Sequence, residues 1–240
     1  MPLDKSCESI TLKAMEPFLY YPVKQPINPK NLFGANPNEY APLGQKGHPG
    51  VDFEAPTGTP IYSPCDGVAF YASDSIGGDG IWIRTTDGTN NYNVILWHMP
   101  TPALNPPAGV TSTKNYPFSI PTSNFVTTPV KAGQKLGYTD NSGYHPTGVS
   151  ESTGPHLHLG IMPADETWQP LNKGNGFLGC VDPQPFFNGK FAEDILEAQV
   201  IQASSNVVQL VQTATDAQVS HTDKLSVLAA IEQFLKSLIP

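Results

Sequence analysis

Histidine and aspartate residues with metal-ligand spacing stand at two places in the chain. His48 and Asp52 form a His-x-x-x-Asp motif within GHPGVDFEAP, and His156 and His158 form a His-x-His motif within STGPHLHLGI. Two imidazoles and one carboxylate are a borderline nitrogen and oxygen ligand set that suits Zn²⁺. A site with only three protein ligands keeps its fourth position open for water, as a catalytic zinc site requires.

The His-x-His spacing has a direct geometric meaning if the segment is a strand. Side chains two residues apart on a strand lie on the same face. We therefore expect His156 and His158 to point the same way, while the alternate residues Leu157, Leu159 and Ile161 face the core.

A further candidate, His98, ends the apolar run NYNVILWHM. The same alternation predicts that His98 shares one face of its strand with Val94 and Leu96, and that Trp97 and Met99 lie on the other face. Each motif alone arises often by chance in a chain of this composition. They become suggestive together because each lies in β-like sequence framed by glycine and proline.

The elements that must position these side chains read as short strands. Asp66-Gly67, Asp87-Gly88 and the glycine cluster at residues 77–80 are hairpin signals between apolar runs. The runs are PIYSPCDGVAFYA, GIWIRTTDG, NYNVILWHM, QKLGYTD and PHLHLGIM. The sequence therefore predicts a mainly β fold, with an antiparallel sheet and long loops.

The chain divides into three parts by composition. Residues 1–45 form an irregular lead-in that we expect to pack on the following domain, residues 46–187 carry the strands and the candidate zinc site, and residues 188–240 are helical. Within the central part, residues 100–129 are rich in Pro, Thr and Ser. A loop of this length is often functional, and a surface excursion and a wall of a substrate groove are both consistent with it.

The last part has apolar residues at helical spacing in two stretches, which predicts a helical hairpin. The first stretch comprises Leu196, Val200, Ala203, Val207, Leu210 and Val211, and the second comprises Leu225, Leu228, Ile231, Leu235 and Leu238. Packing on the chain's own domain and docking or oligomerisation with another chain both fit these apolar faces.

Composition and charge exclude several classes of function. The 240 residues carry a formal net charge of −8, which argues against nucleic acid as a partner. The sequence contains no apolar stretch of ~18 residues that could span a bilayer. The N-terminal stretch lacks the basic start and apolar core of a Sec signal peptide. The three cysteines, Cys7, Cys65 and Cys180, form no CxxC pair and are expected to be idle thiols.

Longer stretches around the motifs resemble the lysostaphin-type (LytM-like) zinc peptidoglycan endopeptidases. The resemblance covers roughly residues 30–187 and does not reach the first thirty residues or the helical part. It is carried by GHPGVDFEAPTGTPIYSPCDGVAFYA, VKAGQKLGYTDNSG, STGPHLHLGI and GFLGCVDPQPFF.

The resemblance implies a role for each candidate residue. His48, Asp52 and His158 match the family's three metal ligands. His98 and His156 match two catalytic histidines that are not ligands, and they would orient the attacking water, take its proton and steady the oxyanion. The sequence contains no HExxH motif, so the glutamate base of helical zinc peptidases is absent and histidine must serve instead.

One position departs from the family pattern. Leu96 stands where the family often has the tyrosine of a Tyr-x-His motif ending at the histidine here numbered 98. We interpret this as a change in packing that leaves activity intact. Tyr40 and Tyr92 are candidates for a phenol near the site, and His145 lies in a loop that looks longer than the family's usual link.

The expected function is zinc-dependent hydrolysis of cross-links or stem peptides in bacterial peptidoglycan, at the cell wall. A phage tail-associated lysin or a phage endolysin fits the sequence, and the alternative is a non-catalytic wall-binding or structural virion component on the same fold. Glycine bridges and D-Ala–diaminopimelate cross-links are both cleaved by relatives, and the sequence does not decide between these bonds.

Overall fold

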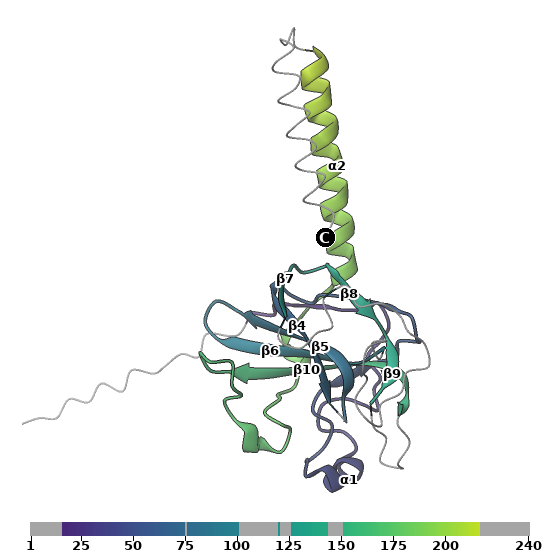
Figure 1. The fold of residues 1–240 in the computed structure, drawn as a ribbon, viewed down its shortest axis with the longest axis vertical. Coiled ribbons are helices and arrows are strands. Elements are labelled where there is room, and N and C mark those ends of the chain that lie inside the picture. Colours follow the sequence, from purple (N-terminus) through teal and green to yellow (C-terminus); the bar gives the residue numbers. More distant parts are fainter. Residues whose placement is uncertain (1–15, 75, 101–119, 121–125, 144–150, 217–240) are drawn as a thin grey trace, which may run out of the picture.

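The computed structural model describes residues 16–74, 76–100, 120, 126–143 and 151–216, and the structural statements below concern these residues (Figure 1). The strands are β1 (Leu19–Tyr21), β2 (Val51–Phe53), β3 (Pro60–Tyr62), β4 (Gly67–Asp74), β5 (Gly78–Thr86), β6 (Asn91–Met99), β7 (Thr127–Val130), β8 (Lys135–Tyr138), β9 (Asp140–Ser142), β10 (Glu151–Ala164) and β11 (Phe187–Phe191). The helices are α1 (Pro37–Tyr40), α2 (Ala192–Asp216) and the 3-10 turns η1 (Ala41–Leu43), η2 (Lys173–Asn175) and η3 (Gln184–Phe186).

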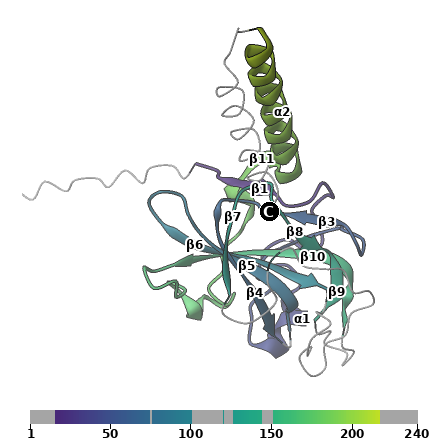
Figure 2. The same cartoon turned by 45° about the horizontal axis from the view of Figure 1, so that its top comes forward.

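A central antiparallel sheet runs in the order β2-β10-β6-β5-β4-β7, with β9 pairing on β10. Two small sheets flank it, the antiparallel pair β3-β8 and the parallel pair β1-β11 (Figure 2). The predicted mainly β fold with an antiparallel sheet is therefore confirmed.

Two of the three predicted hairpins are confirmed. Asp87-Gly88 joins β5 to β6, and the glycine cluster begins β5 after β4, with which it pairs antiparallel. The prediction at Asp66-Gly67 was wrong, because β3 pairs with β8 while β4 pairs with β5 and β7. A turn dipeptide marks a change of direction, but tertiary packing decided which strands met.

Each face of the central sheet has its own apolar cluster. Leu157, Leu159 and Ile161 of β10 are fully buried in the main core, as their alternation with His156 and His158 predicted. The opposite face carries a smaller cluster of Ile95, Met162 and Cys180, with Phe33, Trp82, Trp97 and Phe177 packed against it. The candidate site lies on this second face.

The alternation predicted for β6 was wrong at its end. Asp79 pairs with Met99 and Ile81 pairs with Leu96, so two residues of β6 oppose one of β5. This is a β-bulge, and His98 adopts a left-handed φ of 65° within it. Leu96 and Met99 are consequently both in the main core, while His98 turns toward the opposite face.

The lead-in is more ordered than predicted. It supplies β1, which pairs parallel with β11 from the far end of the domain, and the short helix α1. Leu19 and Val23 are buried in the main core, so this segment packs against the sheet. Figure 2 shows β1 and β11 side by side.

The first predicted C-terminal helix is confirmed as α2, which projects away from the sheets (Figure 1). Its first turn is tied to the domain, since Tyr62 donates to Glu193 at 3.2 Å and Lys24 bridges Glu193 and Asp194. No helix of the described residues is long and apolar enough to cross a membrane. The predicted second helix, Cys7, His145 and most of residues 100–129 lie outside the described residues.

Candidate metal centre

Three side chains, two from neighbouring strands and one from the turn before β2, converge on one point. His48 Nε2 and His158 Nδ1 lie 2.8 Å apart. Asp52 Oδ1 lies 3.1 Å from each of these nitrogens. All three residues are buried, and they form a group able to hold a metal ion. The structure thus brings together the three residues that the sequence named as ligands.

Strand pairing sets this geometry. Asp52 of β2 pairs directly with His158 of β10, so the two side chains leave the sheet beside each other. His48 lies one turn before β2, held by hydrogen bonds in which its N–H donates to Ala35 O and its carbonyl accepts from Gly34 N–H, both at 2.8 Å. Gly50 leaves the space for the ring of His158, because a Cβ there would lie 2.7 Å from His158 Cε1.

The Asp52 carboxylate is held in its charged form. Burial opposes its ionisation, but hydrogen bonds from His158 and His48 outweigh burial and hold the pKa of Asp52 well below its usual value. Burial also lowers the pKa of His158, which favours the neutral imidazole that a metal requires.

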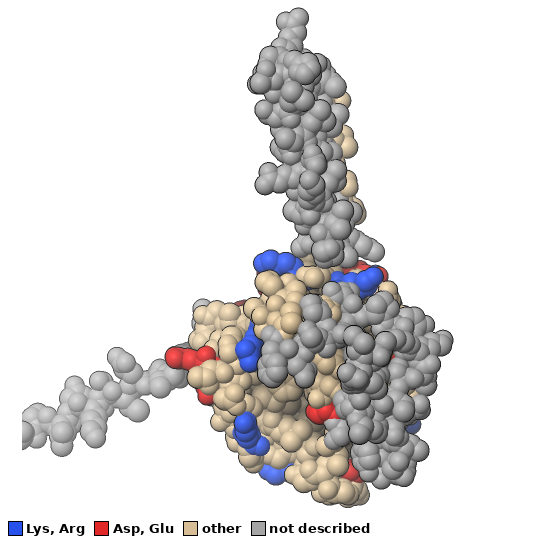
Figure 3. All heavy atoms as spheres, viewed as in Figure 1, with Lys and Arg blue, Asp and Glu red and all other residues tan. Residues whose placement is uncertain are grey.

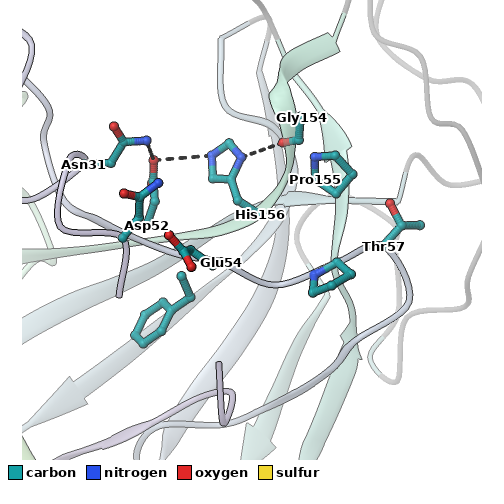
Figure 4. Close-up of a pocket in the computed structure, with 10 residues that line it drawn as sticks. Asn31, Asp52, Glu54, Thr57, Gly154, Pro155 and His156 are labelled. Carbon is teal, nitrogen blue, oxygen red and sulfur yellow. Dashed lines mark hydrogen bonds and ion pairs between the residues drawn. The ribbon is translucent and has the colours of Figure 1, made fainter. Parts of the chain in front are cut away.

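Asn31 orients the carboxylate from behind, a role that the sequence did not reveal. Its Nδ2 donates to Asp52 Oδ2 at 2.9 Å, which leaves Oδ1 facing the two histidines (Figure 4). Asn36 donates in turn to Asn31 Oδ1 at 3.1 Å and so fixes which way the amide points. Asn31 precedes the first strand of the central sheet, and no spacing links it to the two motifs.

The two remaining histidines each have one ring nitrogen tied to a backbone carbonyl. His98 Nδ1 lies 2.7 Å from Ser142 O, and His156 Nδ1 lies 2.7 Å from Gly154 O (Figure 4). A carbonyl can only accept, so Nδ1 carries the proton in both rings and each Nε2 keeps a lone pair when the ring is neutral.

These two rings belong to the same cluster as the metal ligands. The ring centroids of His98 and His156 are 4.4 Å apart, and those of His98 and His158 are 6.0 Å apart. His156 Nε2 lies 3.6 Å from Asp52 Oδ2. Burial, followed by the neighbouring His156 and His158, lowers the pKa of His98 well below its usual value, so His98 is a neutral base.

The bulged end of β6 is braced from β9. Gly143 follows the Ser142 carbonyl that holds His98, and it adopts a φ of 132°. A Cβ on Gly143 would lie 2.7 Å from Ile76 O and 3.0 Å from His98 Nδ1. Only glycine allows the loop to approach the His98 ring this closely.

Of the two candidate phenols, Tyr40 is near the site and Tyr92 is not. The ring of Tyr40 lies 5.6 Å from that of His48, centroid to centroid. Burial, and then the charge of Asp52, raises the pKa of Tyr40, so it stays a proton donor. Tyr92 instead packs on Phe18 and donates to Asp87, so that prediction was wrong.

The two described cysteines, Cys65 and Cys180, are not among the candidate ligands. Cys65 is buried in the main core and Cys180 in the smaller cluster, and burial raises the pKa of each thiol to about 12. Protonated, buried thiols are poor metal ligands and poor nucleophiles. The expectation of idle thiols is confirmed for these two.

The metal centre lies between two hollows in the surface. A cavity of about 910 Å³ extends over the second face of the sheet and is bordered by the three ligands, His98, His156 and Tyr40. A second cavity of about 590 Å³ lies beyond Asp52 and His156, next to Asn31 and Pro155 (Figure 4). An extended chain could therefore cross the centre with space on both sides.

The surface around the described elements carries few charges. The face in Figure 3 is mostly uncharged, with isolated basic and acidic side chains and no continuous basic area.

Comparisons with known proteins give a consistent similarity. No model of a protein family matches the chain. Over 158 residues, 65% of its length, it is 30% identical to an uncharacterized metalloprotease of Buchnera aphidicola subsp. Baizongia pistaciae. The chain spans about a third (34%) of the length of that curated relative.

Two solved structures illustrate the likeness in fold. The catalytic domain of the antimicrobial peptidase lysostaphin from Staphylococcus simulans is 23% identical, with 70% of this chain and 88% of that chain covered and a TM-score of 0.38. LytU is 27% identical, with 58% of this chain and 71% of that chain covered and a TM-score of 0.35.

Proposed function

We propose that this chain is a zinc-dependent endopeptidase that hydrolyses peptide bonds of bacterial peptidoglycan. The observation that carries the proposal is the convergence of two kinds of group on one cavity. His48, Asp52 and His158 form a three-ligand centre, and the two further histidines beside it have their tautomers fixed by backbone carbonyls. A non-catalytic binding module would not need these two further histidines.

The ligand set fits zinc. Two neutral imidazole nitrogens and one carboxylate oxygen are suitable donors, and their mutual separations of 2.8 and 3.1 Å leave them in position to share one ion. When bound, zinc lowers the pKa of water to about 7 and polarises a carbonyl as a Lewis acid.

The chain's own side chains account for the proton transfers. In the neutral ring, His98 and His156 each have a lone pair on Nε2, with which either can take the proton of the attacking water and later return it to the leaving amine. The Tyr40 phenol stays protonated and can donate to the oxygen that becomes negative when the carbonyl is attacked. Tyr40 comes from α1, whereas Leu96 is buried in the main core on the other face of the sheet.

The peptidoglycan substrate is supported by the sequence resemblance and by the shape of the site. The groove is open on both sides of the centre, as an endopeptidase that cuts within a chain needs, and its sheet floor is largely apolar. The similar proteins include a metalloprotease and an antimicrobial peptidase.

The test is digestion of purified cell walls of defined cross-link type, with and without a chelator. We expect new amino termini, identified by mass spectrometry, that disappear with the chelator and return when Zn²⁺ is added. Cleavage that resists the chelator, or no cleavage of any wall type by the zinc-loaded protein, would contradict the proposal. The second result would favour the alternative of a wall-binding scaffold.

The biological setting is a separate part of the proposal. We infer that the peptidase serves a phage, as a tail-associated lysin or an endolysin. Its support is α2, which extends from the sheet domain in the way an attachment element does (Figure 1). Mass spectrometry of purified particles and of the cleared lysate tests this: presence in particles supports the first role, presence only in the lysate supports the second, and absence from both contradicts the inference.

A further inference from the structure

An arginine lies on the floor of the same cavity that borders the metal centre. Arg84 of β5 pairs with Asn93 of β6 on one side and with Val68 of β4 on the other. It shares a face of the sheet with Trp82, two residues before it, and both line the cavity of about 910 Å³. This face is the one that carries the smaller apolar cluster.

Two aromatic rings hold the Arg84 side chain. The guanidinium carbon lies 5.1 Å from the ring centroid of Phe70 and 5.7 Å from that of Trp168. Contacts of this kind are attractive, and they fix the plane of the guanidinium group. Arg84 is therefore held in place before any ligand arrives.

The charge of Arg84 has no partner within the part of the chain that the structure describes. Its Nε is buried and makes no hydrogen bond there. None of the ion pairs among the described residues, which extend to 4.0 Å, includes Arg84. A half-buried cation with an unused donor is costly unless something supplies the missing acceptor.

The covering tryptophan is also held in place. Trp168 adopts a left-handed φ of 66°, which is unfavourable for a bulky side chain. The turn that imposes it is built on Asp165, whose Oδ1 accepts from the N–H groups of Thr167 at 2.7 Å and of Gln169 at 3.0 Å. Asn93 Nδ2 donates to Trp168 O at 3.1 Å, which ties this turn to the strand beside Arg84.

The strand register gives the distance from the metal centre. His158 pairs with Trp97, and Arg84 pairs with Asn93, four residues along the same strand. With ~3.3 Å per residue and ~4.8 Å between strands, the backbones of Arg84 and His158 are about 16 Å apart. An extended peptide covers this span with about five residues, so one peptide can reach both places.

We propose that Arg84 binds a free carboxylate of the peptide substrate within about five residues of the cleaved bond. The inference rests on the proposed peptidase function and names its substrate class. The planar fork of donors on a guanidinium matches a carboxylate, and the two neighbouring aromatic rings hold it for that contact. Arg84 is a specificity-determining residue in this account.

The proposal separates the two bond types that the sequence left open. A diaminopimelate residue in a cross-link keeps a free carboxylate, whereas a glycine bridge has no charged side chain. The enzyme therefore selects carboxylate-bearing cross-links over neutral glycine bridges. Two other cations line this cavity, Lys30 and Lys173, and both are exposed. Lys173 donates to Gln169 at 3.3 Å.

The test uses the zinc-loaded full chain and two matched cross-linked peptides that differ in one group, a carboxylate in one and a carboxamide in the other. We expect the wild type to cleave the carboxylate peptide with a kcat/KM about tenfold higher or more, since a charge-assisted hydrogen bond is lost in the amide. Arg84→Gln should remove this preference mainly by raising KM for the carboxylate peptide, and Arg84→Lys should keep part of it.

Lys190→Gln is the matched control, because it removes one exposed cation from β11, away from the cavity, and should leave the preference unchanged. Zinc content and thermal unfolding of each variant show whether it is folded. Equal cleavage of both peptides by the wild type would overturn the proposal without any variant. An equal loss on both peptides in folded Arg84→Gln would also overturn it, because a purely structural role predicts that result.

The proposed peptidase function and the role of Arg84 can be contradicted separately. If the wild type cleaves neither peptide and no wall of either type, the proposed function fails and the inference falls with it. If the wild type cleaves glycine-bridged walls as fast as diaminopimelate walls, the peptidase function stands and the role of Arg84 is wrong.

Discussion

Five ionisable side chains make up the centre, namely Asp52 and four histidines. The histidines differ in the group that contacts one of their ring nitrogens. His48 and His158 turn a nitrogen toward Asp52 Oδ1, whereas His98 and His156 have one nitrogen held by a backbone carbonyl. In the proposed function, the first group holds the ion and the second exchanges protons. This difference leads to variants that should differ in their zinc content.

Replacing His98 or His156 by Ala should lower turnover by ~10²–10⁴-fold, the usual contribution of general acid–base catalysis, while zinc stays bound. Replacing His158 by Ala should remove zinc as well as turnover, because a three-ligand site loses a third of its donors. Metal content by mass spectrometry and peptide hydrolysis measure the two effects separately. Loss of zinc from the His98 or His156 variant would show that ligands and bases are wrongly assigned.

Asn31 provides a second prediction at the scale of one residue. Its amide holds Asp52 Oδ2 at 2.9 Å, so Asn31→Ala should weaken zinc binding by ~10–100-fold without removing a ligand. Competition with a chelator of known affinity gives the change in Kd. Asn28→Ala is a matched control, since Asn28 lines the same small cavity but its side chain contacts the Lys30 N–H instead. Equal affinity in both variants would count against an orienting role for Asn31.

At the scale of the element, the bulge in β6 decides whether the site exists. Regular alternation would leave His98 on the core side with Leu96, and the extra residue turns its ring to the cavity instead. Gly80 lies opposite the bulge, and a Cβ there would collide with the carbonyl oxygen of Leu96 and the ring of Trp97. The bulge therefore depends on a residue without a side chain at position 80.

Gly80→Ala should destabilise the fold by ~1–3 kcal/mol through overpacking and should also displace His98. We expect turnover to fall with zinc retained, because the candidate ligands lie elsewhere. His158 is on β10, Asp52 is within β2 and His48 precedes β2. Denaturant unfolding and hydrolysis provide the measurements. Gly174→Ala is the control, since a Cβ there meets nothing within 4 Å. Normal turnover in Gly80→Ala would mean that the bulge tolerates a side chain.

At the scale of the whole molecule, the sheets and α2 are joined through a small area. Ala192 is buried, and Glu193 bonds Tyr62 and Lys24, while described side chains further along the helix such as Ile201 and Val208 are 67% and 66% exposed. The described part of α2 thus gives the sheet domain little beyond its first turn. Of the two alternatives that the sequence left open, packing on the chain's own domain is therefore limited, for the described side chains, to this first turn.

Ending the chain after residue 195 should keep zinc content and hydrolysis of a soluble peptide, with Tm within about 2 °C of the full chain, because the buried first residue of α2 is retained. Calorimetry and peptide hydrolysis test this. A large fall in Tm would show that the helical part stabilises the domain. A change in size by light scattering, with Tm unchanged, would instead indicate that this part joins copies of the chain.

The sequence by itself determined the mainly β class, most strands of the central sheet and two motifs of candidate ligands. Apolar alternation and glycine turns respond to local geometry, and the His-x-x-x-Asp and His-x-His motifs have a spacing fixed within a few residues. The resemblance to a family then singled out His48, Asp52 and His158 as expected ligands and His98 and His156 as expected bases.

Tertiary structure decided what depends on contacts between distant segments. Strand pairing chose β8 as the partner of β3, the bulge opposite Gly80 reversed the direction of His98, and folding of the lead-in brought Asn31 and Tyr40 to the centre. The tertiary structure also placed Arg84 beside the rings of Phe70 and Trp168, which come from other segments. None of these has a local signal, because each is fixed by the packing of residues far apart in the chain.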